Sequence, residues 1–413
     1  MSRIDELVHE LCPDGVEHAG VLDIADYVRG ITYSKNDEDL AGEIQVLRAN
    51  NITLASNTLN FEDVKRVSSH VRVREAQRLR AGDTLICAGS GSRDHIGKVA
   101  YIREDIDPTF GGFMAVLRTT DVRVESRFLF HLLTGERFKA HLDRSLSTST
   151  INNLNASVMR GFRVPVPPLE VQREIVRVLD TFTQLEAELE AELEARRAQY
   201  EHYRAGLLKF DLDQVDSVTV LDGFETRNGY TPAKSDPTNW TNGTVPWFRM
   251  EDIRENGRVL DSALQTIPEK AVKGGRYFPA NSLIFATSAT IGEHALITVP
   301  FMANQRFTAI WPKQDYADRF DMKFLFYYGF VIDEWCRNNT TTSSFASVDM
   351  VNFKRLRIPI PPMEEQKCVA NQLDHFDALV YDISIGLPAE LASRRKQYEY
   401  YRDRLLTFKE EAV

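Results

Sequence analysis

The sequence predicts an α+β fold: two mixed α/β globular units, each followed by a long helix, with the two helices paired as an antiparallel coiled coil under intramolecular pseudo-twofold symmetry. The first observation is the motif Arg-Val-Pro-Val-Pro-Pro-Leu-Glu-Val-Gln at 163–172, which returns as Arg-Ile-Pro-Ile-Pro-Pro-Met-Glu-Glu-Gln at 357–366. The second is a helical stretch after each copy, closing on Arg-Arg-Ala-Gln-Tyr-Glu-His-Tyr-Arg at 196–204 and Arg-Arg-Lys-Gln-Tyr-Glu-Tyr-Tyr-Arg at 394–402. A period near half the chain, present twice, is too long for a solenoid or a propeller.

Weaker echoes of the repeat mark out a globular unit ahead of each motif. Residues 30–35 match 229–234, 46–52 match 247–253, 83–86 match 282–285, 128–130 match 324–326, and 147–151 match 341–345. Short β-branched runs predict strands at 84–87, 99–102 and 307–311, and helical spacing predicts helices over 127–142 and 320–337. Because the units differ elsewhere in loops and charge, we expect two related sites for two different ligands.

The motifs divide the 413 residues into four segments. We expect a first globular domain at 1–162, a central helical region at 163–213, a second globular domain at 214–356 and a C-terminal helical region at 357–413. Each globular segment is long enough to bury a core of its own.

The tandem prolines of each motif impose an extended entry, and a helix can begin directly after them. In the first helix an apolar or long side chain recurs every three or four residues, at Ile175, Leu179, Phe182, Leu185 or Glu186, Leu189, Leu193, Arg196, Tyr200, Tyr203 and Leu207. About 38 residues at about 1.5 Å each make a rod of roughly 57 Å, which needs a partner. The second helix supplies one with Val369, Leu373, Phe376, Val380, Ile383, Leu391, Tyr398, Tyr401 and Leu405. An antiparallel pair is the simpler arrangement, because the second globular unit begins soon after Phe210.

The two helices differ in their middle sections. The first contains three tandem four-residue units over 185–196, Leu-Glu-Ala-Glu twice and then Leu-Glu-Ala-Arg. Each such unit lengthens a helix by about 6 Å, so besides forming a solvated acidic face the units act as a ruler. The second contains Pro388, which we expect to kink or break the helix.

Composition indicates a reduced, cytoplasmic protein. The four cysteines show neither disulfide nor zinc spacing, the N-terminus is acidic where a signal peptide is basic, and no apolar run reaches membrane-spanning length. The net charge of −10 argues against nucleic-acid binding, but residues 64–80 carry a local balance of +5 and residues 170–201 one of −5. The basic run is either a solvated face or a nucleic-acid contact.

Motifs for catalysis are missing from the sequence. The loop from Gly89 to Val99 has five residues between Gly91 and Gly97 where a phosphate-binding GxxxxGK[ST] loop has four, and Val99 replaces its hydroxyl residue. It is either a plain turn or a Gly- and Ser-rich turn whose amides approach a phosphate. No GxGxxG after a strand, HExxH or GxSxG occurs. We therefore expect a protein that is not an enzyme and holds neither metal nor cofactor.

The alternation of a variable globular unit, Pro-Pro-x-x-x-Gln, a long helix and Arg-Arg-x-Gln-Tyr-x-x-Tyr-Arg, all present twice, resembles the DNA-specificity subunit of Type I restriction-modification systems. The resemblance covers the whole chain, including the opening Leu-Cys-Pro-Asp-Gly-Val-Glu at 11–17. It implies two target-recognition domains at opposite ends of an antiparallel coiled coil, each reading half of a bipartite, asymmetric site in double-stranded DNA.

The resemblance also implies partners and cofactors. The helical regions would dock two methyltransferase (modification) subunits, which methylate adenine, and motor-nuclease (restriction) subunits would join for cleavage. S-adenosylmethionine, ATP and Mg²⁺ would be bound by those partners only. The specificity subunit itself catalyses nothing in this family, which agrees with the absence of catalytic motifs.

The family carries no fixed DNA-contact positions, so the candidate contacts are chosen by chemistry. Arg and Gln pair bidentately with guanine or adenine edges, whereas Lys and Ser more often hold phosphate. The polar and basic residues on expected loops and strand ends are Lys35, Arg48, Lys65, Arg66, Arg72, Arg74, Ser90, Ser92, Arg93 and Lys98 in the first unit, and Lys234, Arg249, Thr287, Ser288, Gln305 and Arg306 in the second.

Two other functions are compatible with the sequence. One is a protein-protein scaffold, in which the globular units bind peptides and the coiled coil joins subunits without DNA. The other is a stand-alone modification enzyme, which would bind S-adenosylmethionine as an isolated chain. Binding to DNA of defined sequence distinguishes the first from a DNA-reading protein.

Overall fold

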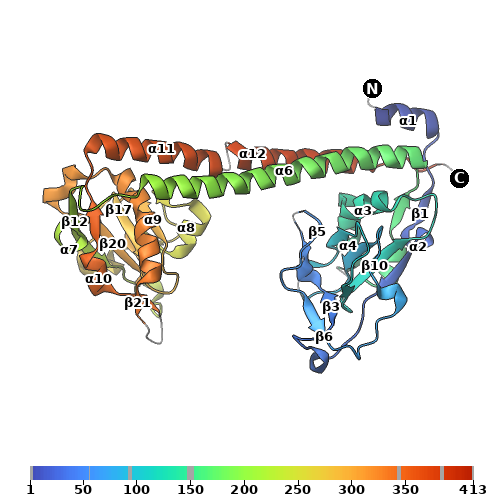
Figure 1. The fold of residues 1–413 in the computed structure, drawn as a ribbon, viewed down its shortest axis with the longest axis horizontal. Helices are drawn as coiled ribbons and strands as arrows, with labels where there is room; N and C mark the ends of the chain where they lie inside the picture. Colours follow the sequence, from blue (N-terminus) through green and yellow to red (C-terminus); the bar gives the residue numbers. More distant parts are fainter. Residues whose placement is uncertain are drawn as a thin grey trace. The chain divides into compact units, whose positions relative to one another are not determined.

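The structure is a computed structural model that describes residues 3–54, 56–91, 95–146, 153–341, 346–381 and 386–411. The chain forms two compact units. Unit 1 contains Met1–Glu192 and Leu387–Val413, and unit 2 contains Leu193–Gly386. Each unit therefore combines one globular part with segments of the long helices, and the elements of both are labelled in Figure 1.

The centre of unit 1 is a four-stranded antiparallel sheet in the order β2-β10-β7-β8. Its strands are β2 (Ala25–Arg29), β10 (Met114–Thr119), β7 (Thr84–Cys87) and β8 (Val99–Tyr101). Side chains alternate between its faces, as the strand period of two requires. Ile86 and Leu117 face the core formed with α3 (Ser126–Thr134) and α4 (Glu136–Leu146), whereas Leu85 and Val116 face a second core on the other side.

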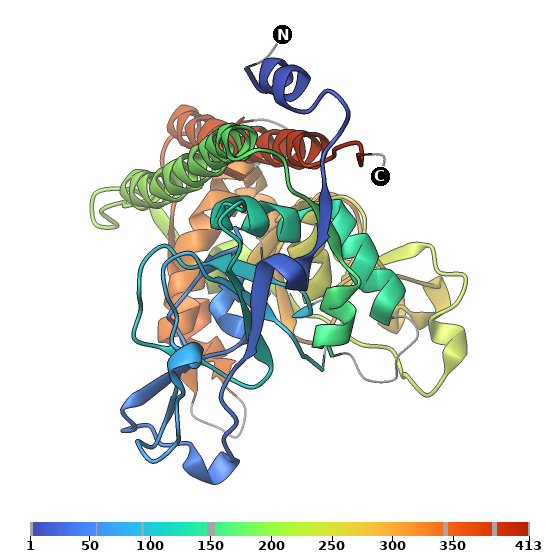
Figure 2. The ribbon, with the colours of Figure 1, turned by 90° about the vertical axis from the view of Figure 1, so that its right-hand side faces the viewer.

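That second core is covered by a smaller sheet, in the order β6-β3-β9. Its strands are β6 (Lys65–Val67), β3 (Ile44–Leu47) and β9 (Thr109–Phe110), and the hairpin β4 (Ile52–Thr53) and β5 (Thr58–Leu59) follows β3. Figures 1 and 2 both show the β6-β3-β9 sheet at the end of unit 1 remote from α6 and α12. The remaining elements of the globular part are α1 (Arg3–Leu11), α2 (Val21–Ile24), α5 (Ala156–Arg160) and the pair β1 (His18–Gly20) and β11 (Arg163–Pro165).

Unit 2 repeats the two sheets and the short strand pair of unit 1, with α8 after β14 and the single helix α9 in place of α3 and α4. Its main sheet is β13-β20-β17-β18-β15, its small sheet is β16-β14-β19, and β12 pairs with β23 as β1 does with β11. The strands are β12 (Ser217–Thr219), β13 (Phe224–Asn228), β14 (Val245–Phe248), β15 (Val259–Leu260), β16 (Thr266–Ile267), β17 (Ser282–Ala286), β18 (His294–Ile297), β19 (Met302–Ala303), β20 (Phe307–Pro312), β21 (Thr340–Thr341), β22 (Ser347–Val348) and β23 (Arg357–Pro359). The helices are α7 (Val220–Gly223), α8 (Met250–Asn256), α9 (Met322–Asn338) and α10 (Met350–Arg355).

Gly30 and Gly229, which open the repeated segments 30–35 and 229–234, lie where another backbone segment approaches closely. A Cβ on Gly30 would lie 2.2 Å from the carbonyl oxygen of Gly111, and one on Gly229 would lie 1.9 Å from that of Asn304. Only a residue without a Cβ fits at either place. The same steric requirement in both units shows that they share a backbone scaffold and not only a sequence pattern.

The glutamine of each Pro-Pro-x-x-x-Gln motif joins the globular part to its helix. Gln172 is fully buried; its Nε2 donates to the carbonyl oxygens of Arg123 at 2.8 Å and Pro167 at 2.6 Å, and its Oε1 accepts from the Glu125 amide at 2.9 Å. Gln366 makes the matching three bonds, at 2.8 Å each, to Arg319, Pro361 and Asp321. Both glutamines satisfy backbone groups at the start of a helix, where such groups lack intrahelical partners.

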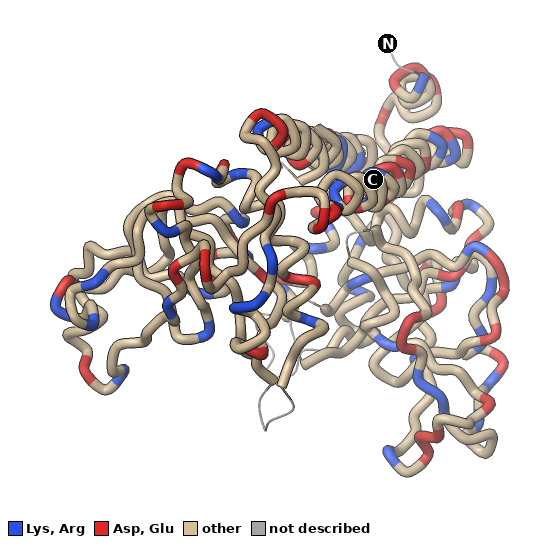
Figure 3. The backbone as a smooth tube through the Cα atoms, turned by 60° about the vertical axis from the view of Figure 1, so that its left-hand side comes forward, with Lys and Arg blue, Asp and Glu red and all other residues tan. Residues whose placement is uncertain are grey.

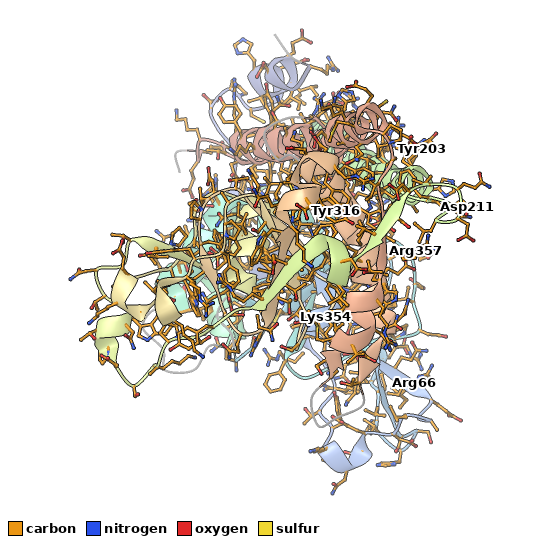
Figure 4. The ribbon with its side chains drawn as sticks, turned by 90° about the vertical axis from the view of Figure 1, so that its left-hand side faces the viewer. Arg66, Tyr203, Asp211, Tyr316, Lys354 and Arg357 are labelled. Atoms are coloured by element: carbon orange, nitrogen blue, oxygen red, sulfur yellow. The ribbon has the colours of Figure 1, made fainter. Side chains whose placement is uncertain are left out.

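The arginine that opens each motif holds the chain segment beside it. Arg163 donates to the carbonyl oxygen of His18 and pairs with Glu410 at 3.0 Å. Arg357 donates to Ser217 Oγ at 3.0 Å and to the Leu212 carbonyl, and it pairs with Asp213 at 3.3 Å. Figure 4 shows Arg357 beside the segment that carries Asp211. The motif is thus architectural in both copies.

The long helices are antiparallel within each unit, as predicted. They are α6 (Leu169–Leu207), which spans 39 residues, α11 (Met363–Tyr381) and α12 (Gly386–Leu405). In unit 1 the ring of Phe182 stacks on that of Tyr401 at 5.7 Å, while Glu186 and Glu190 pair with Arg395.

In unit 2 the ring of Tyr203 stacks on that of Phe376 at 5.9 Å, and that of Tyr200 contacts Tyr381 at 5.8 Å. As the residue number rises along α6 it falls along its partner, in both units.

The middle of α6 departs from the expected apolar stripe. Leu185 is 43% exposed, and the inward position is taken by Glu186, the second of the two residues considered for it. The contact of α6 with α12 is therefore partly ionic. Ile383 of the expected second stripe lies outside the described residues.

The second helical region is interrupted close to Pro388. Gly386, the first residue of α12, has a φ of +70°, outside the right-handed helical region, so α12 does not continue backwards through it. Pro388 lies in the first turn of α12, where its missing amide removes no intrahelical bond. The interruption thus coincides with Gly386, and Pro388 is accommodated just after it.

Most short-range predictions are confirmed. The strand at 84–87 is β7, that at 99–102 is β8 without its last residue, and that at 307–311 is β20 with one residue more. The helix at 320–337 is α9, but the single helix over 127–142 is wrong, because Gly135 has a φ of −78° and a ψ of 163° and separates α3 from α4. No helix within the described ranges is long and apolar enough to cross a bilayer.

Candidate nucleic-acid interface

The basic candidates of unit 1 lie on and around the small sheet, and most of them already have partners. Lys65 pairs with Glu38 at 2.5 Å and Arg48 with Asp63 at 2.8 Å. The Arg66 guanidinium donates to the Gly42 carbonyl at 3.0 Å, and that of Arg74 donates to Gln77 Oε1 at 3.3 Å. In Figure 3 acidic residues alternate with the basic ones along this part of the chain. The local excess of +5 is therefore partly neutralised by the fold.

Two basic candidates of unit 1 differ from these. Lys35 and Arg72 are exposed, and no ion pair to either occurs among the residues that the structure describes. Both belong to connections next to the small sheet. They are the candidates of this unit whose charge is most available to a phosphate.

The Gly- and Ser-rich loop of unit 1 is a hairpin connection between β7 and β8. Gly97 donates its amide to the Cys87 carbonyl at 2.9 Å, and Cys87 donates to the Lys98 carbonyl at 2.8 Å. Lys98 is half-buried and lines a cleft of about 1250 Å³ between the globular part and the helices of unit 1. Ser90 is half-buried. Ser92 and Arg93 lie outside the described residues, so the phosphate-approach reading of this loop stays a prediction.

In unit 2 the candidates divide between exposed and buried positions. Lys234 and Arg306 are exposed, as is Gln305, whose Oε1 accepts from Thr231 Oγ1. Thr287 is only 9% exposed and its hydroxyl bonds with that of Thr308 at 3.0 Å, so this side chain points into the fold. Ser288 is half-buried and forms an isolated bridge with Ser347.

Arg249 is half-buried at the start of α8. Its amide donates to Asp252 Oδ2 at 2.6 Å, as the amide of Arg48 donates to Asn51 Oδ1 at 2.9 Å in the matching place of unit 1. The guanidinium lies 5.8 Å from the Trp247 ring centroid, and its Nε forms a loose ion pair with Glu251 at 3.9 Å but no hydrogen bond among the described residues. The Arg249 backbone is thus fixed by Asp252, whereas the guanidinium Nε has no hydrogen-bond acceptor among the described residues.

One turn differs between the units in a way that sequence inspection missed. Phe113 precedes β10 and Arg306 precedes β20, and their carbonyl oxygens accept from Ala88 at 2.8 Å and from Thr287 at 3.0 Å, respectively. The two positions are equivalent, yet one presents a phenyl ring that is 74% exposed and the other an exposed guanidinium. Aligning the two units by the pairing of their strands places Phe113 opposite Arg306 and reveals this difference.

A second missed group lies ahead of β17. Cys87 and Ala286 occupy the same ladder position, opposite Met114 and Phe307, which sets the register between the units. In that register Lys273 corresponds to Arg74 and Arg276 to Gln77. Both are exposed basic residues that the pattern-based choice did not include.

The joint between globular part and helix contains ionisable groups in unit 1. Arg127 Nε donates to Asp180 Oδ1 at 2.9 Å and His131 Nε2 donates to it at 3.0 Å, while Tyr398 Oη lies 3.5 Å from His131 Nδ1. Burial lowers the pKa of His131, and the bond to Asp180 offsets only part of this. Burial alone would raise the pKa of Asp180, but the bonds from His131 and Arg127 outweigh it and bring that pKa to about 2.

Unit 2 builds the same joint with different chemistry. Tyr327 Oη donates to Asp374 Oδ1 at 2.8 Å, and Lys323 pairs with the same carboxylate. Burial raises the pKa of Tyr327. The imidazole in the joint of unit 1 thus has a phenol as its counterpart in unit 2.

The described parts of the chain contain no cluster of three or more His, Cys, Asp or Glu side chains that could hold a metal ion. The arrangements above place guanidinium, amide and aromatic groups on connections between the elements of a shared scaffold. Such placement is typical of sites that differ in specificity between related units.

Comparison with known proteins bears on the nature of this scaffold. The family model for the Type I restriction modification DNA specificity domain matches residues 13–195 and again residues 213–393. The specificity subunit of the Type I restriction enzyme EcoprrI from Escherichia coli is 59% identical over 207 residues, which cover 48% of this chain and 52% of that protein. The specificity subunit of EcoR124I/EcoR124II, also from Escherichia coli, is 37% identical over 260 residues, which cover 60% and 63%.

The matches span between half and two thirds of the length of these two curated relatives. A solved structure described as the basis of complex assembly and conformational transition of the type I R-M system has a TM-score of 0.64 at 16% identity, covering 95% of this chain and 98% of that one. That likeness concerns the fold. With the family model matched twice over most of the sequence, the chain belongs to the Type I restriction modification DNA specificity family.

Proposed function

We propose that this chain reads a bipartite, asymmetric DNA sequence as the non-catalytic specificity subunit of a Type I restriction-modification complex. Family membership supports DNA recognition as the general role. One structural observation supports the assignment of one half-site to each globular domain. The same backbone scaffold occurs twice, with different side chains at equivalent turns, such as Phe113 and Arg306.

The distribution of shared and different residues supports this division of labour. The residues that both units share, such as Gln172 and Gln366, are buried in the joints and bond to backbone. Phe113 and Arg306, at equivalent turns, differ and are exposed. Two units that keep these glutamines and differ at exposed turns are suited to holding two different reading surfaces on the same scaffold.

We assign the reading domains to 1–162 and 214–356, and the docking of two methyltransferase subunits and of the motor-nuclease subunits to the helical regions 163–213 and 357–413. Outward-facing parts of the helical motifs support a docking role. Tyr400 of α12, which stands at the position of His202 in the first copy of the signature, is 61% exposed. Tyr203, labelled in Figure 4, is 48% exposed although one face of its ring stacks on Phe376. Exposed aromatic side chains on a repeated motif are suited to a protein interface.

A domain exchange tests the proposal. Residues 1–162 are replaced by the matching segment of a relative, the chain is expressed with its methyltransferase subunit, and methylated adenines are mapped across the host genome. We expect one half-site to change and the other to persist. The reciprocal exchange of 214–356 is the matched control and should change the other half only.

Loss of both half-sites in each exchange, with the proteins folded and assembled, would contradict the division of reading between the domains. DNA binding by the full chain with its methyltransferase subunit, measured across salt, tests the broader role. A sequence preference with a steep salt dependence supports DNA reading, whereas its absence favours the peptide-binding scaffold.

A further inference from the structure

We propose that Arg227 and Arg276 of unit 2 form a clamp for one phosphate of the DNA backbone, here called the 227/276 clamp. The inference rests on the proposed DNA-reading function and deepens it by naming a phosphodiester site. It concerns two residues that neither the sequence patterns nor the family match assigns.

Arg227 lies on β13 with its head fixed but incompletely bonded. Its guanidinium carbon is 4.0 Å from the Phe278 ring centroid and 5.7 Å from that of Trp311, so two aromatic rings hold it in place. Its Nη2 is buried and has no acceptor among the described residues. A buried donor without an acceptor is costly, which indicates that an acceptor is supplied from outside the chain.

Three other enclosed arginines of this chain are paired with carboxylates. Arg118 bonds to Asp83 at 2.7 Å, Arg127 to Asp180 at 2.8 Å, and Arg258 to Glu293 at 2.8 Å. Arg258 also stacks on an aromatic ring, that of Phe330 at 5.2 Å, and still has its acid. Arg227 shares the stacking, but no ion pair to it occurs among the residues that the structure describes.

The guanidinium of Arg276 acts on Arg227 as a like charge. Burial first, and then the like charge of Arg276, lower the pKa of Arg227. Arg276 is exposed and shows no ion pair in the parts of the chain that the structure describes. Two neighbouring guanidiniums without an anion repel each other, and a phosphate bound by both replaces the repulsion with charge-assisted hydrogen bonds.

The corresponding residue of unit 1 supports the placement of Arg276 beside β13, the edge strand that carries Arg227. Leu79 and Phe278 occupy the same place in the register, each in an isolated bridge, with Ile106 and Phe301 respectively. Gln77, which corresponds to Arg276, donates from Nε2 to the carbonyl oxygen of Arg29 at the end of β2, at 3.1 Å. β2 corresponds to β13, so position 276 lies beside the strand that carries Arg227.

The surroundings favour a nucleic-acid phosphate over an isolated anion. Lys273 lies 5.4 Å from the Tyr230 ring centroid, and Lys270 Nζ donates to Thr238 Oγ1 at 2.7 Å, so two further cations flank the segment. Unit 1 carries Arg74 at the position of Lys273 but Val28 and Gln77 at those of Arg227 and Arg276. The flanking cation is common to both units, whereas the clamp belongs to unit 2 alone.

Salt-dependent DNA binding tests the clamp. The full chain with its methyltransferase subunit is titrated with a duplex that contains its mapped target, and Arg227→Gln, Arg276→Gln and the double variant are compared with wild type. We expect each single variant to lose about tenfold in affinity at physiological salt, and the slope of log K against log salt to fall by about 0.9. Because both arginines hold one phosphate, the double variant should show no larger change of slope.

Arg254→Gln is the matched control, since it removes one exposed positive charge from α8 of the same unit. A slope for the clamp variants equal to that of Arg254→Gln, with wild type binding its target, would overturn the clamp and leave the DNA-reading function intact. Wild type without DNA preference would instead overturn the proposed function. Sequence preference should be unchanged in the clamp variants, because phosphate contacts position the protein without reading bases.

Thermal unfolding separates the clamp from a structural role. If Arg227 serves only to pack on Phe278, Arg227→Gln should lower the melting temperature of unit 2 and leave the salt slope unchanged, and this would refute the clamp. A peptide carboxylate as the true occupant would show as an unchanged slope together with an unchanged melting temperature. Methylphosphonate substitution scanned along the duplex should identify one position that weakens wild type but not Arg227→Gln.

Discussion

Replacing Gln172 by alanine tests whether the repeated motif is a structural joint. The change removes three hydrogen bonds from a fully buried amide and leaves the Glu125 amide and the carbonyls of Arg123 and Pro167 without their partners. An orphaned buried group costs roughly 1–3 kcal/mol, and the carbonyls regain part of this from water, so we expect a loss of about 2–4 kcal/mol. For a unit of this size that corresponds to roughly 4–16 °C in melting temperature.

Scanning calorimetry of the full chain measures the effect, because Gln172 and Gln366 belong to different compact units. Gln172→Ala should shift the transition of unit 1, and Gln366→Ala should shift that of unit 2. Gln184→Ala is the matched control: Gln184 is exposed on α6 and bonds only to Glu188 at 2.9 Å, a contact worth about 0.5 kcal/mol or less. A shift for Gln172→Ala no larger than that of the control would refute the joint.

Three further predictions concern pH, sterics and length. The pKa of His131 is lowered in the folded chain, so the folded state binds fewer protons than the unfolded one. Unit 1 should therefore lose stability as the pH falls below about 6.5, by at most about 1.4 kcal/mol per pH unit. In calorimetry, His131→Gln should abolish this pH dependence. Gly30→Ala should destabilise unit 1 by about 1–3 kcal/mol, because the new Cβ meets the Gly111 carbonyl oxygen at 2.2 Å. Gly206→Ala is the control and should not destabilise the chain, because the space around Gly206 is open. Equal stability of the two variants would contradict the shared-scaffold argument. Deleting residues 189–192 shortens α6 by about 6 Å and should shorten the spacer of the methylated target by one or two base pairs at about 3.4 Å each; an unchanged spacer would remove the ruler role.

Local patterns predicted those elements whose formation depends on local rules. The strand at 84–87 and the long helix after the first proline motif follow from β-branched runs, apolar spacing and proline sterics, all of which act over a few residues. The antiparallel pairing followed from the short connection after Phe210. The helix over 127–142 was wrong because Gly135 adopts an extended conformation that periodicity does not register.

The candidate contacts were harder to choose, because a strand-end pattern does not show which way a side chain faces. Thr287 was selected as a polar residue at a strand end, and it points into the fold. Lys65 and Arg48 were selected for charge, and they are paired with Glu38 and Asp63, which are separated from them by many residues in the sequence. Long-range neutralisation of this kind cannot be read from local charge counts.

The sequence by itself determined the duplication, the two frames and the long helices, because a repeat of this precision and an apolar period are properties of the chain alone. Tertiary structure decided what the repeated residues do and which side chains remain available. Gln172 becomes a joint only when the carbonyls of Arg123 and Pro167 come within 3 Å of it. Arg227 becomes a candidate for phosphate binding only when Phe278 is brought beneath it and its Nη2 is buried without an acceptor among the described residues. Burial and pairing depend on segments that meet only in the folded chain.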